Sequence, residues 1–141
     1  MEIKENINNV KEFNELYDAV GWGAYDEEVS ELALKNTIYS VSVYDNNEIV
    51  GYGRLIGDGI VFLYIHDIMV KPEYQGKGIG KSIMNKLVER IYKLKEINPD
   101  LRAYLGASKG KEDFYRKCGF ITREEANLGA GMILDTGEEL W

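Results

Sequence analysis

The chain contains 141 residues, of which 45% are hydrophobic and 29% are charged. This length and balance predict a single domain over residues 1–141 and exclude collagen-like and disordered chains. Cys118 is the only cysteine, which excludes an internal disulfide and a cysteine-based metal cluster. No basic leader opens the chain, and no apolar stretch approaches the ~20 residues of a membrane helix. We therefore expect a protein of the reducing cytoplasm, without a membrane partner.

The charge distribution indicates which classes of ligand the protein can bind. The 17 basic and 24 acidic residues give a net charge of −7. Such a surface repels nucleic acid, because phosphate binding needs a clustered basic face, so no nucleic-acid partner is expected. Lys71, Lys77 and Lys81 form one local basic cluster, which favours a small anionic ligand at that point of the chain.

The first half of the chain is predicted to contain two helices followed by strands. Apolar residues recur at helical spacing over residues 6–19, and residues 26–36 follow as a second helix with Asp26 as its N-cap. The chain then changes to runs of β-branched and aromatic residues that are separated by turn residues. These runs predict strands over residues 37–44, 48–56 and 61–70. The last strand is almost continuously apolar and is therefore expected to be buried on both faces.

The second half begins with the strongest helical pattern in the chain. Its apolar positions fall on one broad face, at Ile79, Ile83, Met84, Leu87, Val88, Ile91 and Leu94. A strand over residues 101–107, a short helix over 112–117 closed by Gly119, and two short strands over 120–122 and 132–134 are expected to follow. This order predicts a mixed α/β (α+β) domain, with a mainly antiparallel central sheet, flanking helices and one strand–helix–strand crossover.

Residues 75–81 have the sequence Gln-Gly-Lys-Gly-Ile-Gly-Lys and lie between the apolar strand and the long helix. The first amides of a helix lack internal partners, and the helix dipole adds partial positive charge there. Glycines at positions 76, 78 and 80 remove the Cβ atoms that would keep an anion away from the backbone. The segment therefore predicts a pyrophosphate site. Its glycine spacing fits neither the Walker motif nor the dinucleotide-binding fingerprint.

Two motifs in this chain resemble those of the GNAT superfamily of N-acetyltransferases. Gln75, Gly78 and Gly80 match the Gln/Arg-x-x-Gly-x-Gly/Ala loop of this family, and residues 114–120 match its late aromatic-Tyr-x-Lys-x-Gly-Phe run. Ser108 departs from the pattern, because the family often has asparagine at this position. The resemblance implies a GNAT-like fold, acetyl-CoA as cosubstrate with no metal, and direct transfer of the acetyl group to a primary amine.

The resemblance also implies roles for particular residues. A bulge in the strand before the loop would free backbone groups at Ile68, Met69 and Val70 to bind the pantetheine arm. Tyr115 matches the tyrosine that contacts the cofactor and protonates the leaving thiolate. The backbone amides that would hold the pyrophosphate belong to Gln75, Gly76, Lys77, Gly78, Ile79, Gly80 and Lys81.

Several other side chains have both a functional and a structural interpretation. His66, the only histidine, is a candidate general base or a hydrogen-bonded core residue. Asp67 and water are the alternative bases. Strand alternation places Asp67 on the opposite face from His66, so at most one of the two is expected to line the cleft. Cys118 is expected in the core, and Trp141 either in the core or at a homodimer contact.

The loop between the first two helices is the expected acceptor region. Trp22 and Tyr25 would present aromatic faces to a cationic amine, and Glu28 would add negative charge beside them. The structural alternative is that the acids of this segment only complement the dipole of the second helix. The chain is thus predicted to be an enzyme that acts on a small-molecule or peptide amine. A non-catalytic acyl-CoA sensor of the same fold is the alternative, and the presence of Tyr115 favours catalysis.

Overall fold

The computed structural model describes residues 1–139. The chain divides into two units, Met1–Leu105 and Gly106–Trp141. The prediction of one domain over residues 1–141 stays a prediction. Trp141, with its predicted core or dimer contact, lies outside the described residues.

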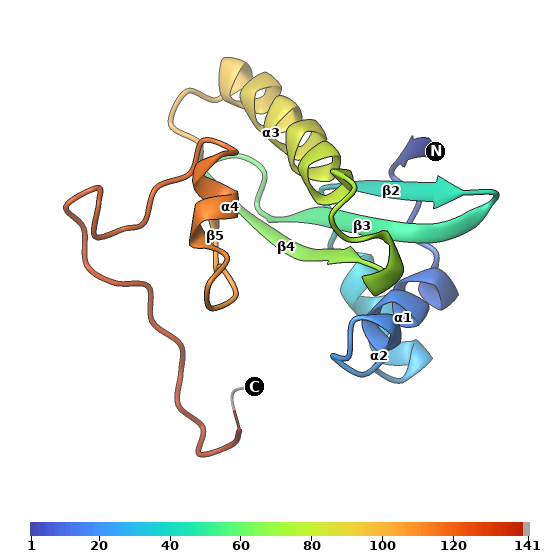
Figure 1. The fold of residues 1–141 in the computed structure, drawn as a ribbon. Coiled ribbons are helices and arrows are strands. Elements are labelled where there is room, and N and C mark those ends of the chain that lie inside the picture. Colours follow the sequence, from blue (N-terminus) through green and yellow to red (C-terminus); the bar gives the residue numbers. More distant parts are fainter. Residues whose placement is uncertain (140–141) are drawn as a thin grey trace. The chain divides into compact units, whose positions relative to one another are not determined.

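A five-stranded sheet organises the first unit (Figure 1). Its strands are β1 (Glu2–Glu5), β2 (Tyr39–Asp45), β3 (Glu48–Gly57), β4 (Phe62–Val70) and β5 (Arg102–Leu105). They lie side by side in chain order. Neighbours from β1 to β4 are antiparallel, whereas β5 is parallel to β4. The predicted mixed fold with a mainly antiparallel sheet is confirmed.

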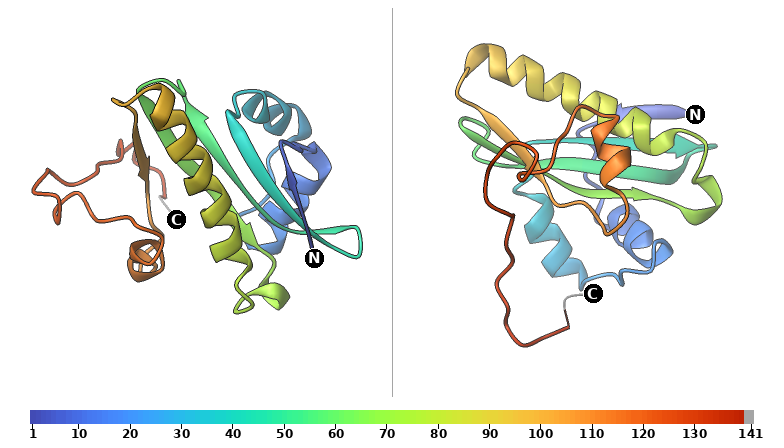
Figure 2. Two further views of the ribbon diagram at one scale, coloured as in Figure 1. Left: turned by 90° about the horizontal axis from the view of Figure 1, so that it is seen from above. Right: turned by 60° about the vertical axis from the view of Figure 1, so that its left-hand side comes forward.

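Helices cover both faces of this sheet. The helices α1 (Val10–Ala19) and α2 (Glu27–Leu34) lie on one face, and α3 (Ile79–Ile97) lies across the other (Figure 1 and Figure 2). The first predicted helix begins later than expected, because Asn9 is its N-cap and accepts a hydrogen bond from the Glu12 amide at 3.0 Å. The amphipathic pattern of α3 is confirmed by its buried residues, which are Ile79, Ile83, Met84, Leu87 and Ile91.

The hydrophobic core is divided by the sheet into two layers. Between the sheet and the first two helices lies a buried cluster of Phe13, Leu16, Tyr17, Leu34, Tyr44, Ile49, Tyr52 and Met69. On the α3 side, Gly53 of β3 leaves room for its neighbours. A Cβ atom there would lie 2.6 Å from Ile68 Cδ1 and 2.7 Å from Ile83 Cγ2. The missing side chain thus lets α3 pack closely on the sheet.

The strand β4 is not buried on both faces, contrary to the prediction. Its burial alternates, with Leu63, Ile65, Asp67 and Met69 buried and the intervening residues half-buried or exposed. The strands β2 and β3 are the ones buried along nearly their whole length. The reason lies in the helix cover, because α3 packs more extensively on β2 and β3 than on β4.

Three other short elements differ from the prediction. β1 was not expected, because its sequence Glu-Ile-Lys-Glu is mostly charged. In the structure its four residues are all exposed. It exists because it pairs with β2 along its length. Residues 120–122 and 132–134, predicted as strands, are irregular. Within the described residues, no neighbouring strand pairs with them, and the side chain of Met132 is 96% exposed.

The second unit contains the short helix α4 (Glu112–Arg116), as predicted. Gly119 follows it with φ +98°, the left-handed conformation expected at a helix end. Glu125 then ties the following turn to α4, because its Oε1 accepts hydrogen bonds from the Thr122 amide and from Arg116 Nε, each at 3.0 Å. Within residues 1–139, no helix is long and apolar enough to cross a membrane.

Candidate functional site

The glycine-rich loop joins β4 to α3. After β4, a single 3₁₀ turn, η1 (Pro72–Tyr74), leads into Gln75, whose Nε2 donates to the Val70 carbonyl at 3.0 Å. Gly76 and Gly78 follow with φ angles of +77° and +82°, which side chains rarely tolerate. A Cβ atom at either glycine would meet no atom within 4 Å, so both glycines border open space.

The N-terminus of α3 is suited to an anion. Gly78 is its N-cap and supplies no side-chain hydrogen bond, and the first turn contains no acidic residue. The first amides of the helix therefore have no side-chain cap, and the dipole favours negative charge there. Lys77 and Lys81 are exposed, and Lys77 Nζ lies 5.1 Å from the centroid of the Tyr74 ring. The predicted segment 75–81 thus combines open backbone with positive charge.

The strand before the loop contains the predicted bulge. Tyr52 pairs with Met69 but Arg54 pairs with His66, so β4 has one residue more than β3 in this interval. Asp67 lies in the bulge with φ +57°. The ladder between β4 and β5 ends at Ile65, so in the described part of the chain residues 66–70 pair with β3 alone. The predicted residues Ile68, Met69 and Val70 lie in this segment, beyond the end of the β4–β5 ladder.

A polar cluster of Tyr17, Arg54, His66 and Asp67 surrounds the bulge. Arg54 Nε donates to Asp67 Oδ2 at 2.6 Å, and the Tyr17 hydroxyl donates to Oδ1. His66 Nδ1 lies 3.0 Å from the same Oδ1. The prediction that alternation separates His66 from Asp67 is therefore wrong. The positive φ of Asp67 interrupts the alternation, and the two adjacent side chains meet.

Burial and hydrogen bonding set the charge states in this cluster. Burial would raise the pKa of the Asp67 carboxyl, but hydrogen bonds from His66 and Tyr17 and the charge of Arg54 outweigh it and lower this pKa. Asp67 is therefore a buried carboxylate at neutral pH. Burial, followed by the hydrogen bond to Asp67, raises the pKa of Tyr17, so this phenol remains a donor.

The aromatic residues predicted for the acceptor region pack next to this cluster. The ring centroids of Trp22 and Tyr25 lie 5.4 and 5.2 Å from that of Tyr17. Both side chains remain about half exposed, at 48% and 51%. Their loop is held in place, because the Trp22 amide donates to the Tyr17 carbonyl at 3.0 Å and Asn14 Nδ2 donates to the Tyr25 carbonyl at 3.1 Å. Glu28 lies in the first turn of α2 and is exposed.

Tyr115 belongs to the second unit, on α4, where its ring centroid lies 5.0 Å from that of Phe114. Burial, followed by the nearby Cys118 thiol, raises the pKa of Tyr115. This phenol is therefore protonated at neutral pH, as a proton donor must be. Cys118 itself is half-buried.

Two members of the polar cluster were missed by the sequence analysis. Tyr17 lies within the helical pattern over residues 6–19, and neither it nor Arg54 was given a role in the site. A signal for Arg54 was present, because it is a lone charge in the apolar run from Ile49 to Ile56. A buried arginine requires a carboxylate partner, and Asp67 supplies it.

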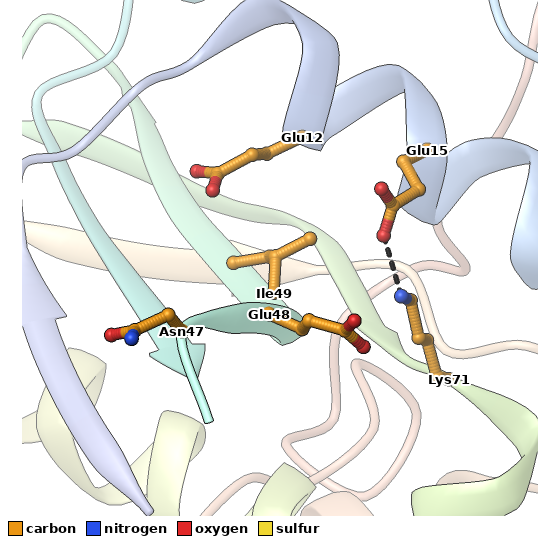
Figure 3. A pocket seen from close by; sticks show the side chains of 6 residues that line it. All are labelled: Glu12, Glu15, Asn47, Glu48, Ile49 and Lys71. Atoms are coloured by element: carbon orange, nitrogen blue, oxygen red, sulfur yellow. Dashed lines mark hydrogen bonds and ion pairs between the residues drawn. The ribbon is translucent and has the colours of Figure 1, made fainter. Parts of the chain in front are cut away.

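A separate pocket of about 360 Å³ lies between α1, the β2–β3 turn and Lys71 (Figure 3). It is lined by Glu12, Glu15, Asn47, Glu48, Ile49 and Lys71. Lys71 Nζ donates to Glu15 at 2.5 Å, and Glu12 accepts from the Tyr44 hydroxyl at 2.6 Å. Lys71 of the predicted basic cluster lines this pocket, whereas none of the residues predicted for catalysis, cofactor binding or acceptor binding does. No group of three or more His, Cys, Asp or Glu side chains among residues 1–139 is arranged to hold a metal ion.

Comparison with known proteins identifies the family. A family model for the acetyltransferase (GNAT) domain matches residues 8–134. The "uncharacterized N-acetyltransferase ycf52" of Porphyra purpurea is 32% identical over 83% of this chain and 67% of its own length. The "GCN5-related N-acetyltransferase 1, chloroplastic" of Arabidopsis thaliana is 28% identical over 89% of this chain and 62% of its own length. This chain thus spans about two thirds of the length of these relatives. Because the plant relative is chloroplastic by name, a cytoplasmic location stays a prediction.

Solved structures show the same fold. A "probable acetyltransferase" from meticillin-resistant Staphylococcus aureus superposes with a TM-score of 0.82 at 28% identity, covering 94% of this chain and 97% of that one. A GNAT-family acetyltransferase from Streptococcus pneumoniae gives 0.78 at 25% identity, covering 96% and 98%. An aminoglycoside 6'-N-acetyltransferase complexed with coenzyme A shares the fold at 20% identity, with a TM-score of 0.65 and 84% of each chain covered. Together with the family model, these matches show that the chain belongs to the GNAT superfamily of N-acetyltransferases, a family of acyltransferase enzymes.

Proposed function

We propose that this chain transfers an acetyl group from acetyl-CoA to a primary amine. The observation that most supports this proposal is the segment from β4 to α3. It contains a bulged strand whose end pairs on one side only, two glycines that border open space, and a helix without a side-chain cap. The family membership of the chain supplies the reaction class.

The residues of the loop fit this cosubstrate. The amides at the start of α3 and the exposed Lys77 and Lys81 would bind the pyrophosphate, and Gly76 and Gly78 would let it approach the backbone. Backbone groups of residues 68–70 would bind the pantetheine arm. When bound, acetyl-CoA supplies the acetyl group as an activated thioester.

The remaining predicted residues would transfer protons or bind the amine acceptor. His66, which is half exposed, would accept a proton from the attacking amine, and the Tyr115 hydroxyl would provide a proton for the departing thiolate. Trp22 and Tyr25 would contact the acceptor, with Glu28 adding negative potential. A small-molecule or peptide amine is the class of acceptor that we propose.

The experiment is an amine panel assayed by release of free thiol from acetyl-CoA, combined with calorimetry of CoA binding. The variant Gly78→Glu places a carboxylate at the open N-cap of α3 and should weaken CoA binding by at least ~10-fold, because it repels the pyrophosphate and fills its site. Gly137→Glu is the matched control, since Gly137 also has a positive φ and open space around it.

The outcomes separate catalysis from sensing. Thiol release with at least one amine, and loss of CoA binding only in Gly78→Glu, would support the proposal. CoA binding without thiol release from any amine would instead support the non-catalytic sensor. Unchanged CoA affinity in a folded Gly78→Glu variant would contradict the placement of the pyrophosphate.

A further inference from the structure

The contact between His66 and Asp67 is unusual for neighbours on a strand. Successive strand residues point to opposite faces, yet His66 Nδ1 lies 3.0 Å from Asp67 Oδ1. Asp67 achieves this with φ +57°, a conformation that is uncommon for a residue other than glycine. Backbone strain of this kind persists only where the surroundings determine it, and it is frequent at functional sites.

The surroundings of Asp67 fix its carboxylate in one position. Its side chain is 1% exposed and accepts hydrogen bonds from Arg54 Nε on β3 and from the Tyr17 hydroxyl on α1. Arg54 is fixed in turn, because its Nη1 donates to the Ala33 carbonyl at 2.9 Å and to Thr37 Oγ1 at 3.2 Å. Tyr17 on α1 thus holds the oxygen that faces the imidazole, and Arg54 on β3 holds the other oxygen of the same carboxylate.

The chemistry of the two groups determines where the imidazole proton lies. An ionised carboxylate only accepts hydrogen bonds, so the imidazole nitrogen that faces it must donate one. In a neutral imidazole the other nitrogen is then an acceptor. The His66 side chain is 48% exposed, on the part of β4 that pairs with β3 alone. Its Nε2 is therefore the nitrogen available to a substrate.

We infer that Asp67 is a positioning residue that holds the proton of His66 on Nδ1 and leaves Nε2 as the proton acceptor for the amine. This inference deepens the proposed function and depends on it. In the proton step, an N–H bond of the acceptor breaks, its electron pair stays on the nitrogen, and the proton bonds to Nε2. The imidazolium then carries a positive charge next to the Asp67 carboxylate, which stabilises it, and the proton passes to water.

The single histidine of the chain allows a direct test. Long-range ¹H–¹⁵N correlation spectra of the tag-free, ¹⁵N-labelled chain, recorded at a pH where the imidazole is neutral, report which nitrogen is protonated. We expect the Nδ1–H tautomer in the wild type. In Asp67→Asn the preference for Nδ1–H should be lost. The kcat should fall roughly 10-fold with an unchanged KM for acetyl-CoA, a smaller loss than the ~10²–10⁴-fold expected on removing a general base.

Two further variants serve as controls, and the first of them tests for a folding defect. Asp67→Asn leaves the Arg54 charge buried without its partner, whereas the double variant Arg54→Gln, Asp67→Asn replaces the ion pair by two neutral amides and should fold. It should show the same loss of the Nδ1–H tautomer and the same fall in kcat. Glu12→Gln is the matched control, because Glu12 also accepts from a tyrosine hydroxyl, at 2.6 Å, and should leave the tautomer unchanged.

The outcomes separate this inference from the proposed function. An Nε2–H tautomer in the wild type, or an Nδ1–H tautomer that persists in the folded double variant, would overturn the role of Asp67 while acetyl transfer remained measurable. Absence of thiol release with every amine would overturn the proposed function and with it the use of Nε2 as a base. The spectra of the same sample would still show whether Asp67 sets the tautomer.

Discussion

Arg54 on β3 and Asp67 on β4 form an ion pair across the bulge, with Nε 2.6 Å from Oδ2 and both side chains buried. Removing either partner of a buried ion pair strongly destabilises the fold, because the remaining charge has no water to solvate it. The pair thus locks the register of β3 and β4 at the point where β4 contains its extra residue.

The first prediction concerns this pair. Arg54→Met should lower the free energy of unfolding by about 3–5 kcal/mol, the usual cost of leaving one buried charge unpaired. The double variant Arg54→Met, Asp67→Asn should recover a large part of this loss. Urea unfolding of the two single variants and the double variant forms the required cycle. If the stability losses of the two single variants add up to the loss of the double variant, the two charges are not coupled.

The second prediction concerns the close packing of α3 on β3. Gly53→Ala should destabilise the fold by about 1–3 kcal/mol, because the new methyl group would lie 2.7 Å from Ile83 Cγ2 and 2.6 Å from Ile68 Cδ1. Gly129→Ala is the control, since a Cβ atom there meets nothing within 4 Å. Equal midpoints in thermal unfolding for both variants would mean that α3 can move outward without cost.

The sequence allowed the prediction of features that depend on local pattern. The apolar face of α3, the glycines before it and the turn residues that separate β2 from β3 each depend on residues close together in the chain. The contact of His66 with Asp67 has a different origin. It depends on an extra residue in β4 relative to β3, and therefore on pairing between segments that no local pattern specifies.

The same reason explains the errors at the ends of the chain. A strand needs a partner as well as suitable residues. The four mostly charged residues of β1 form a strand because β2 provides hydrogen bonds for them. The apolar residues 132–134 were predicted as a strand on composition alone. No strand in the described part of the chain pairs with them.

The third prediction concerns Glu125 in the second unit. Hydrogen bonds from the Thr122 amide and from Arg116 lower its pKa from 4.5 to about 2. A lowered native pKa means that the ionised form stabilises the folded unit above pH 4.5, and that this contribution is lost as the pH falls toward 2. A ¹³C titration of the carboxyl group should give a midpoint near the lower value. In Arg116→Gln the midpoint should rise, and a wild-type midpoint near 4.5 would contradict the hydrogen-bonded arrangement.

The fourth prediction concerns Tyr115 as the proton donor. Tyr115→Phe should lower kcat by ~10²–10⁴-fold, the range for a general acid, and leave CoA affinity unchanged. The raised pKa of Tyr115 keeps the phenol protonated, so the loss should be the same throughout the neutral pH range. Phe114→Leu is a neighbouring control that keeps the phenol. Undiminished turnover in Tyr115→Phe, with chemistry shown to be rate-limiting, would remove this residue from the mechanism.

The fifth prediction concerns the acceptor. Trp22 and Tyr25 present half-exposed rings beside Tyr17, whose hydroxyl donates to Asp67, and Glu27 and Glu28 begin the helix α2. Aromatic faces beside carboxylates attract a protonated amine through cation–π contact and through the Coulomb field. For cationic acceptors, kcat/KM should therefore fall as salt rises, because screening weakens the attraction. Trp22→Ala should raise KM for the amine and leave CoA affinity unchanged.

Charge-reversal variants distinguish the attraction of the acceptor by Glu27 and Glu28 from a general effect of the protein's net charge. The double variant Glu27→Lys, Glu28→Lys should reduce the salt dependence, because it removes the negative potential at the acceptor side. Glu89→Lys, Glu96→Lys is the matched control, since both residues are exposed on α3, across the sheet, and the net charge changes equally. If the best substrates are neutral or anionic and show no salt effect, Glu27 and Glu28 act only on the dipole of α2, where acidic residues in the first turn are stabilising.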